Sequence, residues 1–220
     1  MTAAENARKP KILCLHGKFQ NASTFSNKIA GARRKIARGY DMLFIDGPIV
    51  LEDGYKGDPV NKDNPPRAWW LRSEDGSHIF VRDALVHAIG QCNREEIDVI
   101  LGFSQGGTLA TVLASSGAFP NLKCVITAGA PYVADAFDEA AKLAEEYQND
   151  KSTSLYELGL GIPKFHMAGE NDALVAVEST ECLCEKGGSG TFVVHEQGHL
   201  FPTRALRVQQ VLDFLANHVN

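Results

Sequence analysis

Six short, largely apolar runs recur along the chain and alternate with longer segments of helical periodicity. The runs lie at residues 11–15, 42–46, 97–103, 123–128, 164–168 and 191–195. Most are mainly continuous stretches of apolar residues rather than an alternation of apolar and polar ones, which is typical of strands buried on both faces of a parallel sheet. Helical patterns at residues 24–37, 78–93, 105–116, 175–184 and 203–218 fill the connections between them. The sequence therefore predicts an α/β fold, a doubly wound and mostly parallel sheet of about six strands with helices on both faces.

The length of 220 residues fits a single domain, which we expect to span residues 11–220 after a disordered lead-in at residues 1–10. Two stretches interrupt the alternation. Residues 47–77 are irregular and rich in proline and glycine, and residues 134–161 carry a helical pattern of their own at 136–147. Both insertions follow predicted strands, on the edge where open α/β sheets bind ligands.

Composition excludes several classes of protein. A formal net charge of −5 provides no basic field for a nucleic-acid partner. No apolar run approaches the length of about 18 residues that a stable membrane insertion requires. The first ten residues are polar and lack the apolar region of a secretory signal, so we expect a cytoplasmic protein. The sequence leaves the oligomeric state open.

The five cysteines are an odd number, and no two pairs have metal-binding spacing. Cys14 and Cys124 fall inside apolar runs, where a free thiol behaves as a small hydrophobic group. Cys182 and Cys184 form an isolated C-x-C pair. We expect reduced, structural thiols and no bound metal.

The strongest local motif is the G-x-S-x-G pentapeptide from Gly102 to Gly106, with Ser104 at its centre. An apolar strand precedes the motif, and a helical pattern follows it. A sharp strand-to-helix turn of this kind exposes the serine hydroxyl above the sheet, beside the N-terminal end of the helix. The motif and its context predict Ser104 as a nucleophile, against the simpler interpretation of a serine N-cap between glycines.

A serine nucleophile needs a base, and the base needs an acid to orient it. Among seven histidines, His199 lies in a loop between the last predicted strand and the last predicted helix, which makes it the candidate base. Asp172 follows the strand at 164–168, and the chain order serine, aspartate, histidine is typical of α/β-hydrolases. Glu170 is the nearest alternative acid, and Asp135 and Asp138 are weaker ones.

Acyl transfer also requires N–H donors for the developing oxyanion. The backbone N–H of Gln105, directly after the nucleophile, is one candidate. The second is expected in the loop after the first strand, where Gly17 permits a tight turn that directs the amide of Lys18, or less favourably Phe19, at the site.

These segments together resemble the family of serine hydrolases abbreviated FSH, which are small α/β-hydrolases. The resemblance covers nearly the whole chain. It rests on six segments: residues 13–17 followed by Gln20-Asn21, the turn at 46–48, Arg67-Ala68-Trp69-Trp70, residues 102–107, residues 169–172, and Gly198-His199 with Pro202. It implies a carboxylesterase or thioesterase that acts on acyl esters, with Ser104, Asp172 and His199 as its triad. The sequence departs from the family pattern at Lys18, where relatives often carry an apolar residue, and in a rather short final region.

The resulting hypothesis is a two-step acyl transfer that needs no cofactor and acts on a small-molecule acyl ester or thioester. Phe19, Trp69 and Trp70 are the candidate residues for binding an apolar acyl part, because exposed tryptophans in an irregular segment are uncommon. The alternative for the two tryptophans is that they only pack the insertion onto the sheet. For the whole protein, the alternatives are a hydrolase-fold ligand-binding or receptor protein with little turnover and, with little support, a flavodoxin-like phosphate-binding domain.

Overall fold

The computed structural model describes residues 8–148, 154–188 and 190–219. A central sheet is built from six strands: β1 (Lys11–Leu15), β2 (Asp41–Ile45), β7 (Ile97–Phe103), β8 (Cys124–Ala128), β9 (Lys164–Gly169) and β10 (Gly190–His195). Their order across the sheet is β10-β9-β8-β7-β1-β2, and every neighbouring pair is parallel. All six predicted strands are confirmed to within one residue at either end.

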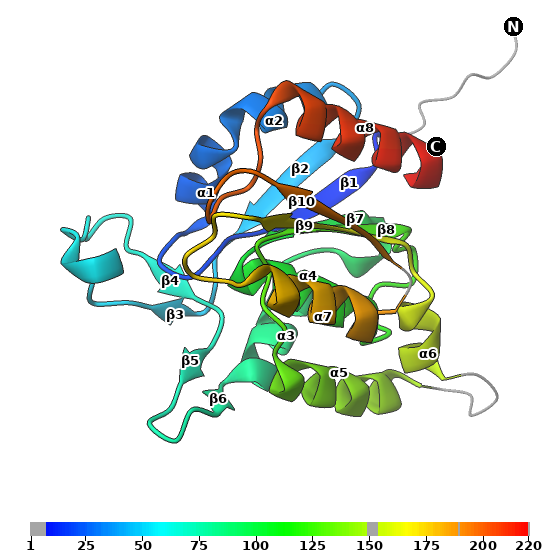
Figure 1. The fold of residues 1–220 in the computed structure, drawn as a ribbon. Helices are drawn as coiled ribbons and strands as arrows, with labels where there is room; N and C mark the ends of the chain where they lie inside the picture. The colour runs from blue at the N-terminus through cyan, green and yellow to red at the C-terminus, as the bar shows by residue number, and fades with distance from the viewer. Residues whose placement is uncertain (1–7, 149–153, 189, 220) are drawn as a thin grey trace, which may run out of the picture.

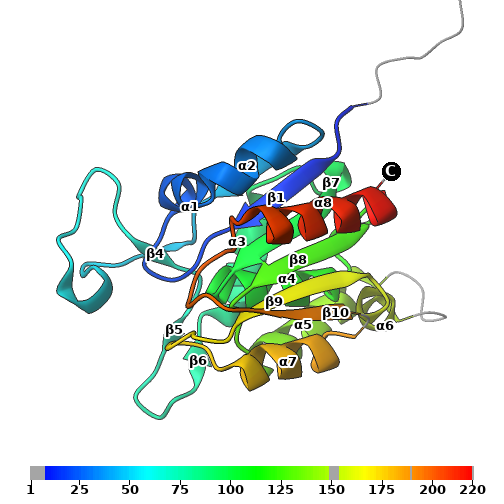
Figure 2. The same cartoon turned by 45° about the horizontal axis from the view of Figure 1, so that its top comes forward.

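Helices cover both faces of this sheet (Figures 1 and 2). On one face lie α1 (Ala22–Lys28), α2 (Ala30–Ile36) and α8 (Ala205–Val219). On the other lie α3 (Val81–Gly90), α4 (Gln105–Ala114), α5 (Ala134–Tyr147), α6 (Leu155–Leu160) and α7 (Val177–Lys186). Each face has its own apolar core, and every residue of β7 and α4 is buried. The predicted doubly wound α/β architecture is therefore confirmed.

Two helix predictions were wrong in detail. The segment predicted as one helix at 24–37 is divided at Ile29, where φ is −98° and ψ is 17°, into α1 and α2. The helix predicted from residue 78 begins at Val81, because His78–Ile79 form the short strand β6 and Phe80 adopts a left-handed φ of 65°. A left-handed residue cannot continue the hydrogen bonding of a right-handed helix, so α3 must begin after it.

The insertion predicted at 47–77 extends to residue 79 and contains two small antiparallel strand pairs beside the main sheet. Strand β3 (Ile49–Val50) pairs with β4 (Arg67–Ala68), and β5 (Leu71–Arg72) pairs with β6 (His78–Ile79). Figure 1 shows these strands at the end of the molecule where the central strands terminate. The second insertion, 134–161, contains α5 and α6, while its residues 149–153 lie outside the described part of the chain.

Residues 1–7 of the predicted lead-in also lie outside the described residues. Arg8, the first described residue, donates to Asp98 on β7 at 2.6 Å. All five cysteine thiols are free. Among the described residues, no helix is both long enough and apolar enough to cross a lipid bilayer.

The parallel arrangement brings the carboxyl ends of all six strands to one edge of the sheet. The chain leaves β1 toward one face and β7 toward the other, and these two strands are neighbours. A pair of neighbouring strands with oppositely directed connections opens a crevice at their carboxyl ends. The loops after β1 and β7 form the site described next.

Candidate active site

Ser104 occupies the turn between β7 and α4 in a backbone conformation that side chains rarely adopt, with φ 53° and ψ −123°. Its N–H donates to the Ala128 carbonyl at 2.9 Å, and its own carbonyl accepts from the N–H of Gly107 at 2.8 Å. These bonds hold the strained turn from the neighbouring strand and from the first turn of α4.

The glycines on either side of Ser104 are required by close packing. A Cβ on Gly102 would come within 2.1 Å of the Gly106 carbonyl oxygen, and one on Gly106 within 2.4 Å of the Leu15 carbonyl oxygen. Real side chains do not tolerate such contacts with backbone, so the strand and helix can approach this closely only with glycine at both positions. The G-x-S-x-G pattern is therefore explained by the crossing of α4 over β7 and β1.

Three side chains form a hydrogen-bonded chain at this turn. The Ser104 hydroxyl lies 2.9 Å from His199 Nε2, and His199 Nδ1 lies 2.6 Å from Asp172 Oδ2. The carboxylate requires the proton of the neutral imidazole to be on Nδ1, which leaves Nε2 free to accept from the serine. The Asp172 side chain is 1% exposed and that of His199 16% exposed, so both lie largely out of water.

Asp172 is itself held by its own loop. Its Oδ1 accepts from the N–H groups of Leu174 at 2.8 Å and Val175 at 2.9 Å, which directs Oδ2 at the imidazole. The His199 ring packs against Phe103, with 4.8 Å between the ring centroids. The ring also lies close to Gly129, where an added Cβ would be 3.2 Å from Nδ1.

The structure brings none of the alternative acids to His199. Glu170 is exposed, and its backbone N–H donates to the His195 carbonyl. Asp135 instead accepts from the backbone N–H and the ring of His78, and these hydrogen bonds lower the pKa of the Asp135 carboxyl. Asp138 follows it on α5 and lines the hollow beside His78.

The amides proposed for the oxyanion lie on either side of Ser104. Gln105 is the first residue of α4, so its N–H has no carbonyl of its own helix to donate to. The Phe19 N–H is already engaged by the Arg67 carbonyl at 2.9 Å. For the Lys18 N–H, the described residues provide no such partner. Between the two amides left open by the sequence, the geometry favours Lys18.

His16 contributes a structural role that the sequence did not indicate. Its Nδ1 donates to the Gly17 carbonyl at 2.8 Å, and its Nε2 accepts from the Gly47 N–H at 2.8 Å. Burial lowers the pKa of His16 to about 4, so the ring stays neutral and keeps both bonds near neutral pH. The ring therefore ties the loop after β1 to the start of the insertion.

The two tryptophans have different surroundings although they are adjacent. Trp69 is fully buried, and its Nε1 donates to the His16 carbonyl at 2.8 Å. The side-chain amide of Gln105 holds this segment by accepting from the Trp69 N–H and donating to the Trp70 carbonyl, both at 2.9 Å. Trp70 is 3% exposed and lines a cavity, whereas Trp69 lines neither of the cavities that reach Ser104.

Ser104 lines two hollows. The smaller cavity has a volume of about 210 Å³ and is lined by Lys18, Trp70, Leu71, Arg72, His78, Ser104, Gln105, Pro131 and Val133. The larger cleft has a volume of about 1000 Å³, and its walls come from the loop after β1, from α1, from residues 54–66 and from residues 171–175 with His199. Phe19 lies in the larger cleft, so the structure separates it from Trp70.

The fold and this strand-to-helix serine define a serine hydrolase with the α/β-hydrolase fold. The acyl-protein thioesterase 2 of Zea mays superposes with a TM-score of 0.64 and 16% identity, covering 98% of this chain and 96% of that chain. The carboxylesterase of Bacillus cereus superposes with a TM-score of 0.60 and 19% identity, covering 95% of this chain and 88% of that one. At these identities the likeness establishes the fold alone.

Sequence comparison identifies the family. The family described as "Serine hydrolase (FSH1)" matches residues 2–211, and the chain belongs to it. The curated relative Esterase OVCA2 of Bos taurus is 27% identical over 93% of this chain and 95% of its own length. The protein is an enzyme of this hydrolase family, as the resemblance implied.

Proposed function

We propose that this enzyme hydrolyses carboxylic esters or thioesters, with Ser104 as nucleophile, His199 as general base and Asp172 as the acid that orients it. The observation that carries the proposal is the continuous hydrogen-bonded chain from the Ser104 hydroxyl through His199 to Asp172. Several curated relatives are named esterases, among them those of Aedes aegypti and Bos taurus, and these names support the reaction class.

The proposed reaction has two steps. Ser104 Oγ attacks the substrate carbonyl carbon while His199 Nε2 takes its proton, and the N–H groups of Lys18 and Gln105 stabilise the oxyanion. His199 then gives the proton to the leaving alcohol or thiol, and an acyl-serine ester remains. In the second step His199 deprotonates a water that attacks this ester, and it returns the proton to Ser104.

We further propose that the small cavity receives an apolar acyl part. Its walls include Trp70, Leu71, Pro131 and Val133, and it begins at Ser104 beside Gln105. With a cavity volume of about 210 Å³, a short acyl chain is the proposed occupant. Of the aromatic residues first considered for this role, the proposal retains Trp70.

The replacement Ser104→Ala tests the nucleophile. We expect kcat to fall by about a thousandfold or more, because no other side chain can form the acyl-enzyme. Labelling by a fluorophosphonate probe should disappear with it, while the folded state is retained. A variant that keeps more than about a hundredth of wild-type kcat, or that is still labelled, would exclude Ser104 as the nucleophile.

An acyl series from acetyl to decanoyl on one alcohol tests the acyl cavity. Each buried methylene should lower the activation free energy that kcat/KM reports by up to about 0.8 kcal/mol until the cavity is full. Beyond that length, kcat/KM should fall as the chain grows. In Trp70→Ala the optimum should move to longer chains, because removal of the indole ring from the wall enlarges the cavity. Trp69→Ala is the matched comparison, and an equal shift of the optimum in both variants would exclude a specific role for Trp70.

A further inference from the structure

The two hollows at Ser104 differ in their position relative to the proposed base, and this inference rests on the proposed function. The leaving atom must receive its proton from His199 Nε2, so the leaving group departs on the His199 side of the serine. His199 lines the large cleft and is absent from the walls of the small cavity. With the acyl part in the small cavity, the large cleft therefore receives the alcohol or thiol part of the substrate.

The charge of the large cleft is opposite to that of the whole chain. The chain has a net charge of −5, yet the cleft is lined by three lysines and by one acidic residue, Asp58. Lys28 and Lys56 line this cleft and not the small cavity, whereas Lys18 lines both. The three lysines come from separate segments: the loop after β1, the end of α1, and the 3₁₀ turn Tyr55–Gly57. Within the described part of the chain, no carboxylate lies within 4 Å of any of their ammonium groups.

Two of these lysines are placed by aromatic rings. Lys18 Nζ lies 5.1 Å from the centroid of the Phe19 ring, and Lys56 Nζ lies 5.3 Å from that of Tyr55. The Phe19 and Tyr55 rings pack edge to face, with their centroids 5.6 Å apart. This contact joins the loop after β1 to the insertion, and each of the two ammonium groups lies beside one ring of this aromatic pair.

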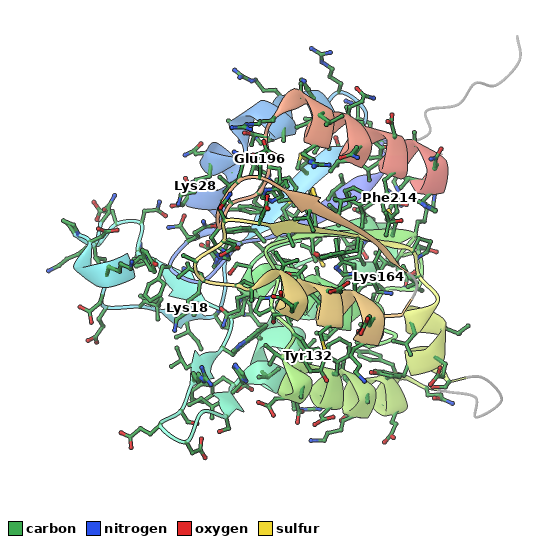
Figure 3. All side chains as sticks on the ribbon, viewed as in Figure 1. Lys18, Lys28, Tyr132, Lys164, Glu196 and Phe214 are labelled. Atoms are coloured by element: carbon green, nitrogen blue, oxygen red, sulfur yellow. The ribbon has the colours of Figure 1, made fainter. Side chains whose placement is uncertain are left out.

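The backbone of this cluster is held in an unfavourable conformation. Phe19 has φ 64° and Lys56 has φ 53°, values in the left-handed region that side-chain-bearing residues rarely adopt. Figure 3 shows Lys18 and Lys28 toward the end of the molecule that carries β3 and β4. Unpaired cations fixed beside an aromatic wall in a cleft of about 1000 Å³ are a suitable receptor for an anion on an extended ligand.

We propose that the natural substrate is an ester or thioester of a short acyl group with a large leaving group that carries an anion, either phosphate or carboxylate. Lys28 and Lys56, with Lys18, bind that anion in the large cleft while the acyl group occupies the small cavity. Specificity then resides mainly in the alcohol or thiol part of the substrate.

Three thioesters with one acyl group test this assignment: acetyl-coenzyme A, S-acetylglutathione and the uncharged S-acetyl-N-acetylcysteamine. We expect kcat/KM to be about tenfold or more higher for acetyl-coenzyme A than for the uncharged thioester at low ionic strength. The advantage should shrink as salt is raised, because the lysines are exposed and screened. If kcat/KM for S-acetylglutathione is raised to the same extent over the uncharged thioester, a carboxylate is sufficient for binding in the large cleft. If only acetyl-coenzyme A has the higher kcat/KM, the bound anion is phosphate.

Variants of the cleft then assign the effect to its lysines. The double variant Lys28→Gln with Lys56→Gln should lower the ratio of charged to uncharged kcat/KM by about two- to fivefold for each charge removed. Lys35→Gln on α2 is the matched control, since Lys35 is an exposed lysine that does not line the cleft, and it should keep the wild-type ratio.

The outcomes separate this inference from the proposed function. A Ser104-dependent hydrolysis of the uncharged thioester, with no preference for either charged one, would overturn the anionic leaving group and leave the triad intact. A preference that survives the double variant unchanged would also overturn it. Absence of both turnover and fluorophosphonate labelling would instead reject the proposed function, and the inference with it.

Discussion

Asp172 and Glu170 lie two residues apart in one loop, yet only Asp172 reaches His199. The difference arises from the backbone: Asp172 Oδ1 accepts two N–H groups from Leu174 and Val175, which turns the carboxylate inward to 1% exposure. Glu170 follows the last residue of β9 with its side chain in solvent. Local hydrogen bonding therefore distinguishes two carboxylates that the sequence could only rank.

This pair provides a matched test of the proposed acid. Asp172→Asn should lower kcat by about a hundredfold or more, because an amide N–H₂ facing Nδ1 stabilises the wrong tautomer of His199. Glu170→Gln should leave kcat within about twofold, as expected for an exposed side chain. Steady-state kinetics of the two purified variants on one ester makes the comparison. The reverse ranking would move the role of the acid to Glu170.

Trp69 and Trp70 illustrate what residue identity cannot reveal. Both belong to an irregular segment with no hydrophobic period, so the sequence could not assign a direction to either ring. The structure places Trp69 in the core against His16 and leaves Trp70 at the wall of the small cavity. The choice depends on the path of the whole insertion, which Gln105 fixes by two hydrogen bonds to its backbone.

At the scale of elements, the packing of α4 against the sheet sets the position of the nucleophile. The helix crosses β7 and β1 so closely that the Gly106 position has no room for a methyl group. The last residue of α3, Gly90, is exposed, and a Cβ there would meet nothing within 4 Å. Both glycines belong to helices, but only the Gly90 position has room for a side chain.

Alanine substitutions at these two glycines should change stability in opposite directions. Gly106→Ala should lower the free energy of unfolding by about 2 kcal/mol or more, because backbone must move to admit the methyl group. Gly90→Ala should be neutral or raise it by up to about 1 kcal/mol, since alanine restricts the unfolded chain and favours the helix. Urea unfolding of both variants measures the difference. A tolerated Gly106→Ala would contradict the explanation given for the motif.

The elements that could be predicted are those with a strong local signal. Largely apolar runs such as Ile97–Phe103 identified the central strands, and the helical spacing of Val208, Val211 and Leu215 identified the last helix. The two-residue strands of the insertion could not be found, because each depends on a distant partner, as Ile49 does on Ala68. The same dependence concealed Tyr55 and Lys56 as parts of the cleft.

The candidate triad was accessible to sequence reasoning because chain order and strand ends bring its members to one edge. The structure brings Ser104, His199 and Asp172 together there, and their catalytic roles remain predictions. The division between two hollows was not accessible, since it depends on how the loop after β1 packs against residues 54–66. For the same reason, Phe19 and Trp70 were grouped in one pocket by the sequence analysis.

At the scale of the whole molecule, two buried histidines couple stability to pH. Burial lowers the pKa of His166 to about 3 and that of His16 to about 4. In the unfolded chain both titrate near pH 6.5, so between about pH 6.5 and pH 4 unfolding takes up protons. The stability that these neutral rings contribute is complete above pH 6.5 and falls as the pH is lowered through this range.

His166→Gln should make stability less dependent on acid. Between pH 7 and pH 5 the variant should lose less unfolding free energy than the wild type, by up to about 2 kcal/mol, because the proton that His166 binds on unfolding is no longer taken up. Its stability at pH 7 will be lower, since His166 Nδ1 and Thr127 Oγ1 are hydrogen-bonded at 2.8 Å. Chemical denaturation at several pH values measures how steeply the free energy of unfolding changes with pH in the variant and in the wild type. An unchanged slope would show that His166 does not contribute.

The spacing of the three proposed catalytic groups along the chain has a consequence for when activity begins. His199 lies 95 positions after Ser104 and 27 after Asp172. A ribosome completes β7 and α4 well before it reaches residue 199, and the base is carried by the loop after β10, the strand at the outer edge of the sheet. Under the proposed mechanism, the nascent chain is therefore inert until the ribosome has passed residue 199 and β10 has paired with β9. During cell-free translation, the moment at which hydrolysis first appears would therefore show when β10 joins the sheet.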